Sequence, residues 1–315
     1  MSELETTPPK TIILPFQKAV YNRLCAIGRA CLTVNRSALG PLKLRTCFLL
    51  LGPTGSGKTF LARAFSKEMN LPIMSMSTSD WILMGSTERG ARSTWPAIFD
   101  FIERVKHQQG AVIFIDELDK CASDSPYTSF LRAEVFSLCD GSVPMNLKNS
   151  EGELIQESRI LEARDFLVNK TMILAGAAFQ EIWEVQSKPS MGFLPSDSGD
   201  TDPELPDLAR FLPREMINRF SSEIFVLPRL TMPDYRVMVE TVAEQIPVMW
   251  RERFLELGIE RLDQAVRHRK GARYLEEILL AAIVMERDSL VNFVPTPTPP
   301  ESSSREVDDL ELTMV

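Results

Sequence analysis

The chain has 315 residues, enough to bury one large domain and a smaller one, and its apolar fraction of 44% and charged fraction of 25% are typical of globular proteins. A formal net charge of -8 argues against a broad nucleic-acid-binding surface, although a local basic pore would not show in that sum. No apolar run approaches the roughly 20 residues of a membrane span, and the first ten residues lack the features of a signal peptide, so we expect a cytoplasmic protein without membrane contact.

The cysteine and histidine content argues against two kinds of site. Five cysteines form an odd set without a CxxC pair, and the sequence contains only two histidines. This pattern suggests neither a disulfide framework nor a zinc site, so we expect buried, reduced thiols. The cysteines are Cys25, Cys31, Cys47, Cys121 and Cys139.

The ends of the chain differ in composition from the middle. Residues 1–10 and 293–315 are rich in proline, serine and acidic residues, and we predict that both are flexible. Between them, short apolar runs suited to buried strands alternate with helix-like segments, which predicts a parallel sheet covered on both faces. The predicted strands are CFLLL (47–51), LPIMSM (71–76), AVIFI (111–115), TMILA (171–175) and EIFVL (223–227).

From about Pro233 onward the strand pattern stops and amphipathic helical patterns follow. The sequence therefore predicts a large α/β domain over 11–230 and a small all-helical domain over 231–292. Two weakly patterned stretches, 141–166 and 187–208, are longer than ordinary loops and are predicted to be insertions between elements.

The first motif with chemical meaning lies between the predicted strand at 47–51 and a helical pattern. Its sequence GPTGSGKT matches GxxxxGK[ST], a loop whose glycines let backbone N–H groups point at phosphate oxygens beside a helix N-terminus. We expect Lys58 to reach the β and γ phosphates of ATP, and the Thr59 hydroxyl to hold Mg²⁺. The predicted nucleotide-binding residues are Gly52, Pro53, Thr54, Gly55, Ser56, Gly57, Lys58 and Thr59.

A second motif, AVIFIDELDK, places two acidic residues directly after an apolar strand. Asp116 is predicted to bind Mg²⁺, and Glu117 is predicted to be the base that polarises the attacking water. Apolar strands often end in acids for solubility alone, so this interpretation depends on the phosphate loop upstream.

With these motifs in place, the chain from about Phe16 to Leu290 resembles the AAA+ ATPases, and within them the ClpX and HslU unfoldases. Four further segments carry the resemblance. AVYNRL (19–24) is similar to the helix before the ClpX phosphate loop, and AAFQEIW (177–183) is similar to the sensor-1 region. LPREMINRF (212–220) is similar to the box with the arginine finger, and GARYLEEIL (271–279) is similar to the sensor-2 motif. The resemblance implies a P-loop AAA+ large domain with a parallel five-stranded sheet flanked by helices, followed by a small helical domain.

The same resemblance gives roles to two arginines. Arg219 corresponds to the finger, which AAA+ proteins supply from the neighbouring subunit, and Arg273 corresponds to the sensor-2 arginine. It therefore implies a homo-oligomeric ring, usually a hexamer, that hydrolyses ATP at its interfaces. Without the family, Arg219 could equally be a surface arginine and Arg273 a residue at a helix start.

Two departures from the family pattern, at the sensor-1 tip and at the pore loop, limit the comparison. The strand at 171–175 continues as AGAAF, without Asn, Ser or Thr at its tip, so no sensor-1 residue is assigned. The pore-loop register falls on Leu83-Met84-Gly85 with Trp81 the nearby aromatic, although these apolar residues could instead cover the core. Met191-Gly192-Phe193 resembles the peptidase-docking tripeptide of ClpX, although such a loop residue more often packs on its own domain.

The predicted function is a Mg²⁺-dependent ATPase, a ring-forming protein unfoldase or remodelling motor that resembles ClpX without its N-terminal domain. The alternative is a nucleotide-controlled assembly switch or scaffold that does not thread a substrate. The pore register and the bare sensor-1 tip favour the switch, whereas Glu117 and Arg219 favour turnover. A DNA-directed motor is disfavoured by the acidic balance and by the lack of a helix-turn-helix or basic appendage.

Overall fold

A computed structural model describes residues 11–34, 44–79, 94–122, 126–148, 153–185, 208–221 and 223–291. Several expectations fall outside the described residues. They concern the two chain ends (1–10 and 293–315), the pore register (Trp81 and Leu83-Met84-Gly85) and the tripeptide Met191-Gly192-Phe193.

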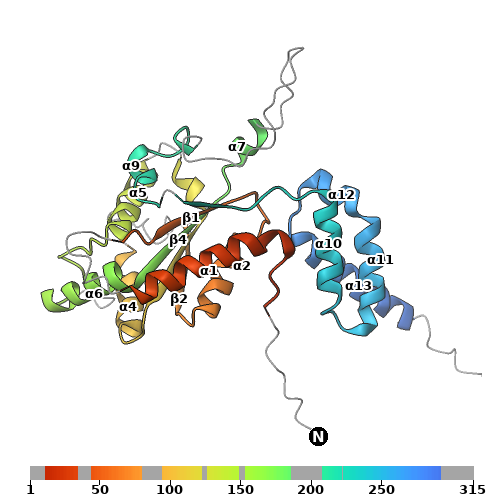
Figure 1. The fold of residues 1–315 in the computed structure, drawn as a ribbon, viewed down its shortest axis with the longest axis horizontal. Coiled ribbons are helices and arrows are strands. Elements are labelled where there is room, and N and C mark those ends of the chain that lie inside the picture. The colour runs from red at the N-terminus through yellow and green to blue at the C-terminus, as the bar shows by residue number, and fades with distance from the viewer. Residues whose placement is uncertain are drawn as a thin grey trace, which may run out of the picture.

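A parallel sheet forms the centre of the larger part of the molecule (Figure 1). Its order is β2-β3-β4-β1-β5, and every neighbouring pair runs parallel. The predicted five-stranded parallel sheet is therefore confirmed. The strands are β1 (Cys47–Leu51), β2 (Ile73–Ser77), β3 (Ala111–Asp116), β4 (Thr171–Ala177) and β5 (Ile224–Val226).

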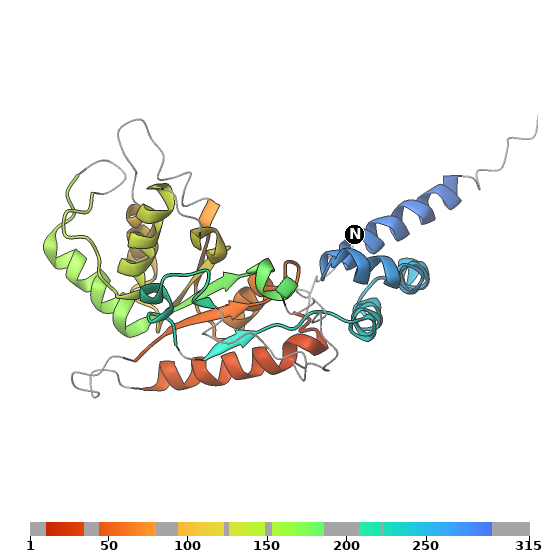
Figure 2. The ribbon, with the colours of Figure 1, turned by 90° about the horizontal axis from the view of Figure 1, so that it is seen from above.

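Helices cover both faces of this sheet, which explains why its central strands are apolar throughout. In β1, Phe48 and Leu50 pack with α1 (Lys18–Thr33) and α2 (Lys58–Glu68). The alternate residues Leu49 and Leu51 face the other cluster, to which α4 (Trp95–Val105), α5 (Pro126–Cys139) and α6 (Glu157–Lys170) contribute. Figure 2 shows α1 on one side of the strands and α5 and α6 on the other. Burial on both faces removes the polar alternation of a half-exposed strand.

The predicted limits of β2 were wrong at its first two residues. The strand begins at Ile73, because Pro72 has no backbone N–H for a sheet ladder. The Pro72 carbonyl still accepts a hydrogen bond from the Val112 backbone N–H at 2.9 Å, so the chain is already beside β3 at that point.

The prediction of one long insertion over 141–166 was also wrong, because α6 begins at Glu157. Only a narrow stripe of this helix is buried, formed by Ile160, Ala163, Phe166 and Leu167, and acidic and basic residues surround it. Such a stripe gives a weak helical pattern in the sequence. The stretch before it contains an isolated antiparallel bridge between Lys148 and Leu154.

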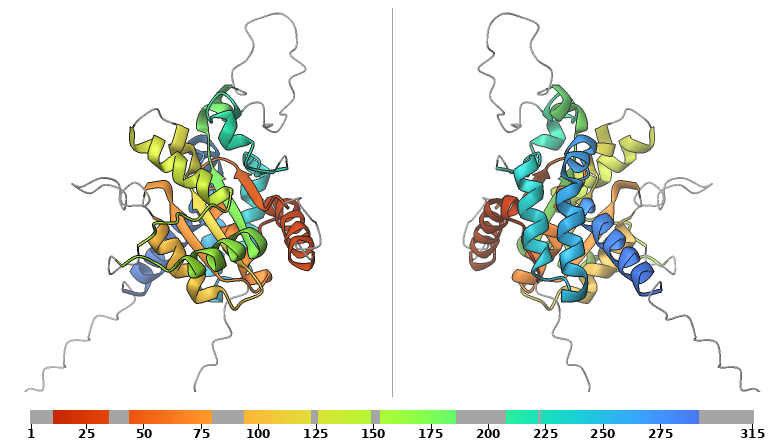
Figure 3. Two further views of the ribbon diagram at one scale, coloured as in Figure 1. Left: turned by 90° about the vertical axis from the view of Figure 1, so that its left-hand side faces the viewer. Right: turned by 90° about the vertical axis from the view of Figure 1, so that its right-hand side faces the viewer.

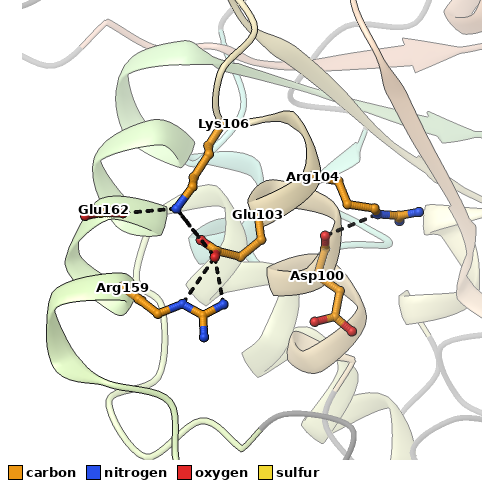
Figure 4. A network of polar contacts seen from close by, with 6 residues as sticks. All are labelled: Asp100, Glu103, Arg104, Lys106, Arg159 and Glu162. Carbon is orange, nitrogen blue, oxygen red and sulfur yellow. Dashed lines mark hydrogen bonds and ion pairs between the residues drawn. The ribbon is translucent and has the colours of Figure 1, made fainter.

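An ion-pair network fastens α6 to α4 (Figure 4). Glu103 on α4 accepts hydrogen bonds from Arg159, with Nη2 at 2.7 Å, and lies 3.2 Å from the Lys106 ammonium, which also pairs with Glu162. Burial by itself would raise the pKa of Glu103, but the hydrogen bonds from Arg159 and Lys106 outweigh it and hold the pKa below its usual value. The Arg159 guanidinium lies 5.4 Å from the centre of the Phe99 ring, which adds packing to the charge contact.

The helices after β5 form a bundle, which faces the viewer in the right-hand view of Figure 3. Its core contains Tyr235, Phe254 and Tyr274, and the two tyrosine rings meet edge to face with centres 5.7 Å apart. The helices are α10 (Met232–Ala243), α11 (Val248–Glu260), α12 (Leu262–His268) and α13 (Arg273–Val291). The predicted change from an α/β part to a helical part is confirmed. Leu14, which precedes the short helix η1 (Pro15–Gln17), is buried in the same core.

Two further findings concern the thiols and the membrane. Cys25, Cys31, Cys47 and Cys121 are buried and Cys139 is partly buried, and none of the five forms a disulfide, which confirms the prediction of buried, reduced thiols. Over the ranges given above, none of the helices combines the length and apolar character that crossing a bilayer requires.

Candidate nucleotide-binding site

The phosphate loop, residues 52–57, leaves the carboxyl end of β1 and leads into α2. Ligands of open parallel sheets bind beyond the carboxyl ends of the strands, and β1 is an inner strand. Gly55 and Gly57 have φ of +80° and +87°, a left-handed conformation that side chains disfavour. The glycines at these two positions therefore allow the tight curl that the motif requires.

Lys58 begins α2 and turns its side chain back over the loop. Its ammonium donates hydrogen bonds to the carbonyl oxygens of Gly52 at 2.8 Å and Pro53 at 3.1 Å. Burial lowers the pKa of Lys58, while the nearby carboxylates of Asp116 and Asp119 act in the opposite direction. The loop thus contains a buried cation that its own carbonyl oxygens hold in place.

Thr59 and Asp116, the two residues predicted to hold Mg²⁺, contact each other. The Thr59 hydroxyl donates a hydrogen bond of 2.5 Å to the Asp116 carboxylate, although 57 positions separate the two residues. The other carboxylate oxygen accepts from the Glu117 backbone N–H at 2.9 Å. A hydroxyl beside a carboxylate fits Mg²⁺, which takes few protein oxygens and completes its octahedron with water and phosphate oxygens.

Glu117 follows β3 in an unusual backbone conformation. Its φ of +58° lies in the left-handed region, which costs energy for a residue with a side chain and often marks a functional position. The carboxylate accepts a hydrogen bond from the Ser79 hydroxyl at 3.1 Å. Glu117 also contributes to the electrostatic environment of Lys58, so it lies at the same end of the sheet as the loop.

A polar residue without a predicted role contacts the loop from the start of the helix after β4. Gln180 begins α7 (Gln180–Val185), and its amide donates a hydrogen bond of 2.8 Å to the Thr54 hydroxyl. Between β4 and Gln180 the chain turns at Phe179, whose φ is +39°. Gln180 thus contacts the loop from a position three residues beyond the end of β4, whereas the strand tip itself has no Asn, Ser or Thr. In the sequence, Gln180 is the polar residue nearest to the end of the strand in the segment AAFQEIW.

The start of α13 lies directly against the loop. The Ala272 backbone N–H donates a hydrogen bond of 2.8 Å to the Gly55 carbonyl oxygen. The preceding residue, Gly271, donates its own N–H to the Tyr235 hydroxyl at 2.8 Å. This arrangement brings Arg273 close enough to lower the pKa of Lys58, although less than burial does. The structure thus places the predicted sensor-2 arginine near the phosphate loop of the same chain.

A cavity of about 650 Å³ opens beside the loop, between the sheet and the helical bundle. Pro53, Thr54 and Gln180 line it on one side, and the end of α12 lines it on the other. The Arg229 guanidinium lies over the Trp183 ring, 5.6 Å from its centre, at the same cavity. Arginine side chains and an aromatic ring around a space next to a phosphate loop suit an anionic, aromatic ligand.

Arg219 lies elsewhere. It precedes β5, and the nearby Ser221 donates its N–H to the carbonyl of Cys47, the first residue of β1, whereas the phosphate loop follows the last one. The five residues of β1 therefore separate Arg219 from the loop, roughly 13–16 Å at the usual strand rise. Helix α9 (Arg214–Ile217), just before Arg219, lies on the side of the sheet away from the helical bundle (Figure 1).

Comparison with known proteins agrees with this geometry. Residues 48–141 match the family model described as "ATPase family associated with various cellular activities (AAA)". The curated relatives include the ATP-dependent zinc metalloprotease FtsH of Methylibium petroleiphilum, 45% identical over 71 residues, which is 22% of this chain and 11% of that protein. FtsH of Cupriavidus metallidurans is 42% identical over 71 residues, or 22% and 10% of the two chains. FtsH 2 of Petrotoga mobilis is 41% identical over 85 residues, or 27% and 12%.

These alignments define how far the similarity reaches. The chain spans about a tenth of the length of the relatives it matches. The relatives are FtsH proteins, so they support the AAA+ resemblance without singling out the ClpX and HslU group. The matched family region runs from β1 to the end of α5 and includes the phosphate loop, Asp116 and Glu117. The chain therefore carries an AAA ATPase domain, built on a five-stranded parallel sheet with a helical part after it.

Proposed function

We propose that this protein is a Mg²⁺-dependent ATPase that hydrolyses ATP between the subunits of a homo-oligomeric ring and uses the cycle to remodel a protein partner. The observation that carries the proposal is that one edge of the sheet gathers Lys58, the Thr59–Asp116 pair and Glu117, while Arg219 lies at the opposite edge. Because Glu117 and Arg219 lie at opposite ends of the strands in one chain, each ATP site needs the arginine of a neighbouring subunit.

In this mechanism each side chain has one task. The backbone N–H groups of the phosphate loop and the Lys58 ammonium bind the phosphates, and Glu117 accepts the proton of the attacking water. Mg²⁺, held through Thr59 and Asp116, would neutralise charge on the phosphate oxygens. Arg219 of the next subunit would stabilise the charge that develops in the transition state, an effect worth ~10³ to 10⁵ in rate.

The nearest alternative is a nucleotide-controlled switch that assembles with ATP and disassembles after hydrolysis, without threading a substrate. One observation favours it. The phosphate loop already contacts the helical bundle through Gly55 and Ala272, so nucleotide binding at the loop would move the bundle directly.

In the motor, Leu83 and Met84 would face the channel, and Met191-Gly192-Phe193 would serve as a docking element.

Light scattering on the Glu117→Gln variant, with and without ATP, tests the central claim. We expect assembly to about six subunits with ATP, because the variant binds nucleotide without consuming it. A monomer in both conditions would overturn the homo-oligomeric ring. Substitution of Leu83 and Met84 by serine then separates motor from switch. The motor loses its remodelling activity while keeping ATPase activity, whereas the switch keeps both ATPase activity and ATP-dependent assembly.

A further inference from the structure

Gln17 is a buried polar residue to which the sequence interpretation gave no role. Its side chain is 1% exposed, and both ends of its amide are used. The oxygen accepts a hydrogen bond from the Leu14 backbone N–H at 3.2 Å, and the nitrogen donates one to the Ser56 carbonyl oxygen at 2.9 Å. A buried amide with both ends bonded has a single favoured orientation, because any rotation leaves a polar atom without a partner.

The amide of Gln17 also lies directly on the backbone of the phosphate loop. A Cβ atom at Gly57 would be 2.3 Å from the Gln17 amide nitrogen, too close for any side chain. Gly57 has φ +87° and precedes Lys58, the first residue of α2. Gln17 therefore packs at the point where the loop becomes the helix, which is where the phosphates would bind.

The segment that contains Gln17 packs on the helical bundle through the neighbours of Gln17. Leu14 is 6% exposed and belongs to the bundle core with Tyr235 and Met238 of α10, and Phe16 packs against the same core. The neighbouring loop carbonyl, that of Gly55, accepts its hydrogen bond from Ala272. Two consecutive carbonyl groups of the phosphate loop thus accept hydrogen bonds from two segments that both pack on the bundle.

We infer that Gln17 is a positioning residue, which fixes the phosphate loop in its nucleotide-binding conformation and couples that conformation to the helical bundle. The inference rests on the proposed function in one respect, since it takes ATP to be the ligand of the loop. Without the amide, the buried Ser56 carbonyl loses its donor and the backbone at Gly57 loses its support. Both losses allow the loop to leave its binding conformation.

The test is the Gln17→Met variant of the full chain. Methionine preserves the length and most of the packing volume but makes neither hydrogen bond. We expect the Kd for ATP to rise about tenfold. We also expect faster hydrogen exchange at amides 55–59 and 271–275 of the nucleotide-free protein, with amides 111–116 of β3 unchanged. Gln17→Glu should raise the Kd further, because it adds a negative charge beside the phosphates.

Gln109 provides a matched control at the opposite end of α2. Its amide nitrogen donates to the Met69 carbonyl oxygen at 3.3 Å, so Gln109→Met also removes a glutamine hydrogen bond to a backbone carbonyl. Met69 is the residue after the last one of α2, far from the phosphate loop. We expect wild-type ATP affinity and wild-type exchange at amides 55–59 in this control.

The inference is overturned if Gln17→Met binds ATP as wild type does and exchanges normally at amides 55–59. It is equally overturned if exchange rises by the same factor in β3, because the residue would then only stabilise the fold. Failure of the proposed function has a different signature. Wild-type protein would bind no ATP, while the exchange rates of the nucleotide-free variants would still support or refute the role of Gln17.

Discussion

Arg219 forms a two-point ion pair with Asp140, in which Nε and Nη2 of the guanidinium donate to the carboxylate at 3.0 and 2.8 Å. The third nitrogen, Nη1, donates to the Glu215 carbonyl oxygen at 2.7 Å, and the Phe136 ring centre lies 4.3 Å below the guanidinium. These contacts use three of the five N–H groups of the arginine. Within the described part of the chain, these contacts leave one N–H on each terminal nitrogen for a further acceptor.

Removal of this arginine should abolish turnover without unfolding the protein. Arg219→Ala is expected to lower the ATPase rate at least ~10³-fold, because the transition-state charge loses its partner. The free energy of unfolding should fall by about 1 kcal/mol or less, since a partly exposed ion pair contributes little. Steady-state ATPase kinetics, ATP binding and denaturant unfolding measure the three quantities. Arg164 is an exposed arginine that lines a surface cavity together with Arg219 and Asp140, so Arg164→Ala is the control and should leave the ATPase rate unchanged.

Mixing two inactive variants tests whether the arginine acts between subunits. Glu117→Gln chains retain Arg219 but have no base, whereas Arg219→Ala chains have the reverse defect. In a mixed ring, the intact base of one chain faces the intact arginine of the other, so ATPase activity should return. Mixed rings that form and stay inactive at every ratio would exclude a finger in trans.

The contact between Gly271 and the phosphate loop gives a further prediction. A Cβ atom at position 271 would lie 2.5 Å from the Gly55 carbonyl oxygen, and φ there is +61°. Gly271→Ala must therefore push the start of α13 off the loop. This movement breaks the hydrogen bond from the Ala272 N–H to the Gly55 carbonyl oxygen and displaces Arg273. We therefore expect the Kd for ATP to rise about tenfold. Isothermal titration calorimetry provides the measurement.

Gly258→Ala is the control for that variant. Its new Cβ would meet the Val239 side chain at 2.6 Å, inside the helical bundle and away from the loop. This change should lower the melting temperature while leaving the ATP Kd of the folded protein as in wild type. Equal losses of affinity in the two alanine variants would mean that bundle stability, and not the loop contact, controls binding.

The parts of the fold that the sequence predicted well are those with local signals. Buried strands such as β1 and β3 are apolar on both faces, and the acids Asp116 and Glu117 mark the carboxyl end of β3. Strand, loop and acidic pair could therefore all be placed from the sequence. Helix α6 was missed because its buried stripe is narrow and charged residues cover the rest.

The contacts that position the loop could not be predicted in the same way. Gln17 and Gln180 reach Ser56 and Thr54 across 39 and 126 positions of sequence. A glutamine at a helix start has no periodic pattern that reveals its partner, because that partner depends on how the elements pack. The family resemblance included both segments but assigned neither side chain.

The free thiols should be unreactive in the native protein. Burial raises the pKa of Cys121 to about 12, so almost no thiolate is present at pH 8, and thiolate is the reactive form. We expect Ellman's reagent at pH 8 to label native protein very slowly and to titrate all five cysteines in guanidinium chloride. Rapid labelling of one thiol in native protein, mapped to Cys121 by mass spectrometry, would contradict the burial described above.

Lys58 should make ATP binding and protein stability depend on pH in opposite directions. Burial lowers the pKa of Lys58 in the folded protein, so between that value and the ordinary value of 10.5 the unfolded chain binds more protons than the folded one. The contribution of Lys58 to the free energy of unfolding therefore increases as the pH rises through this window. ATP affinity should decrease over the same window, because the neutral amine no longer attracts phosphate.

Lys58→Met, which cannot titrate, is expected to bind ATP poorly at every pH. Denaturant unfolding and ATP titration of both proteins between pH 7 and about 10.5 check the two trends. Parallel pH profiles for wild type and variant would show that Lys58 does not titrate in this range.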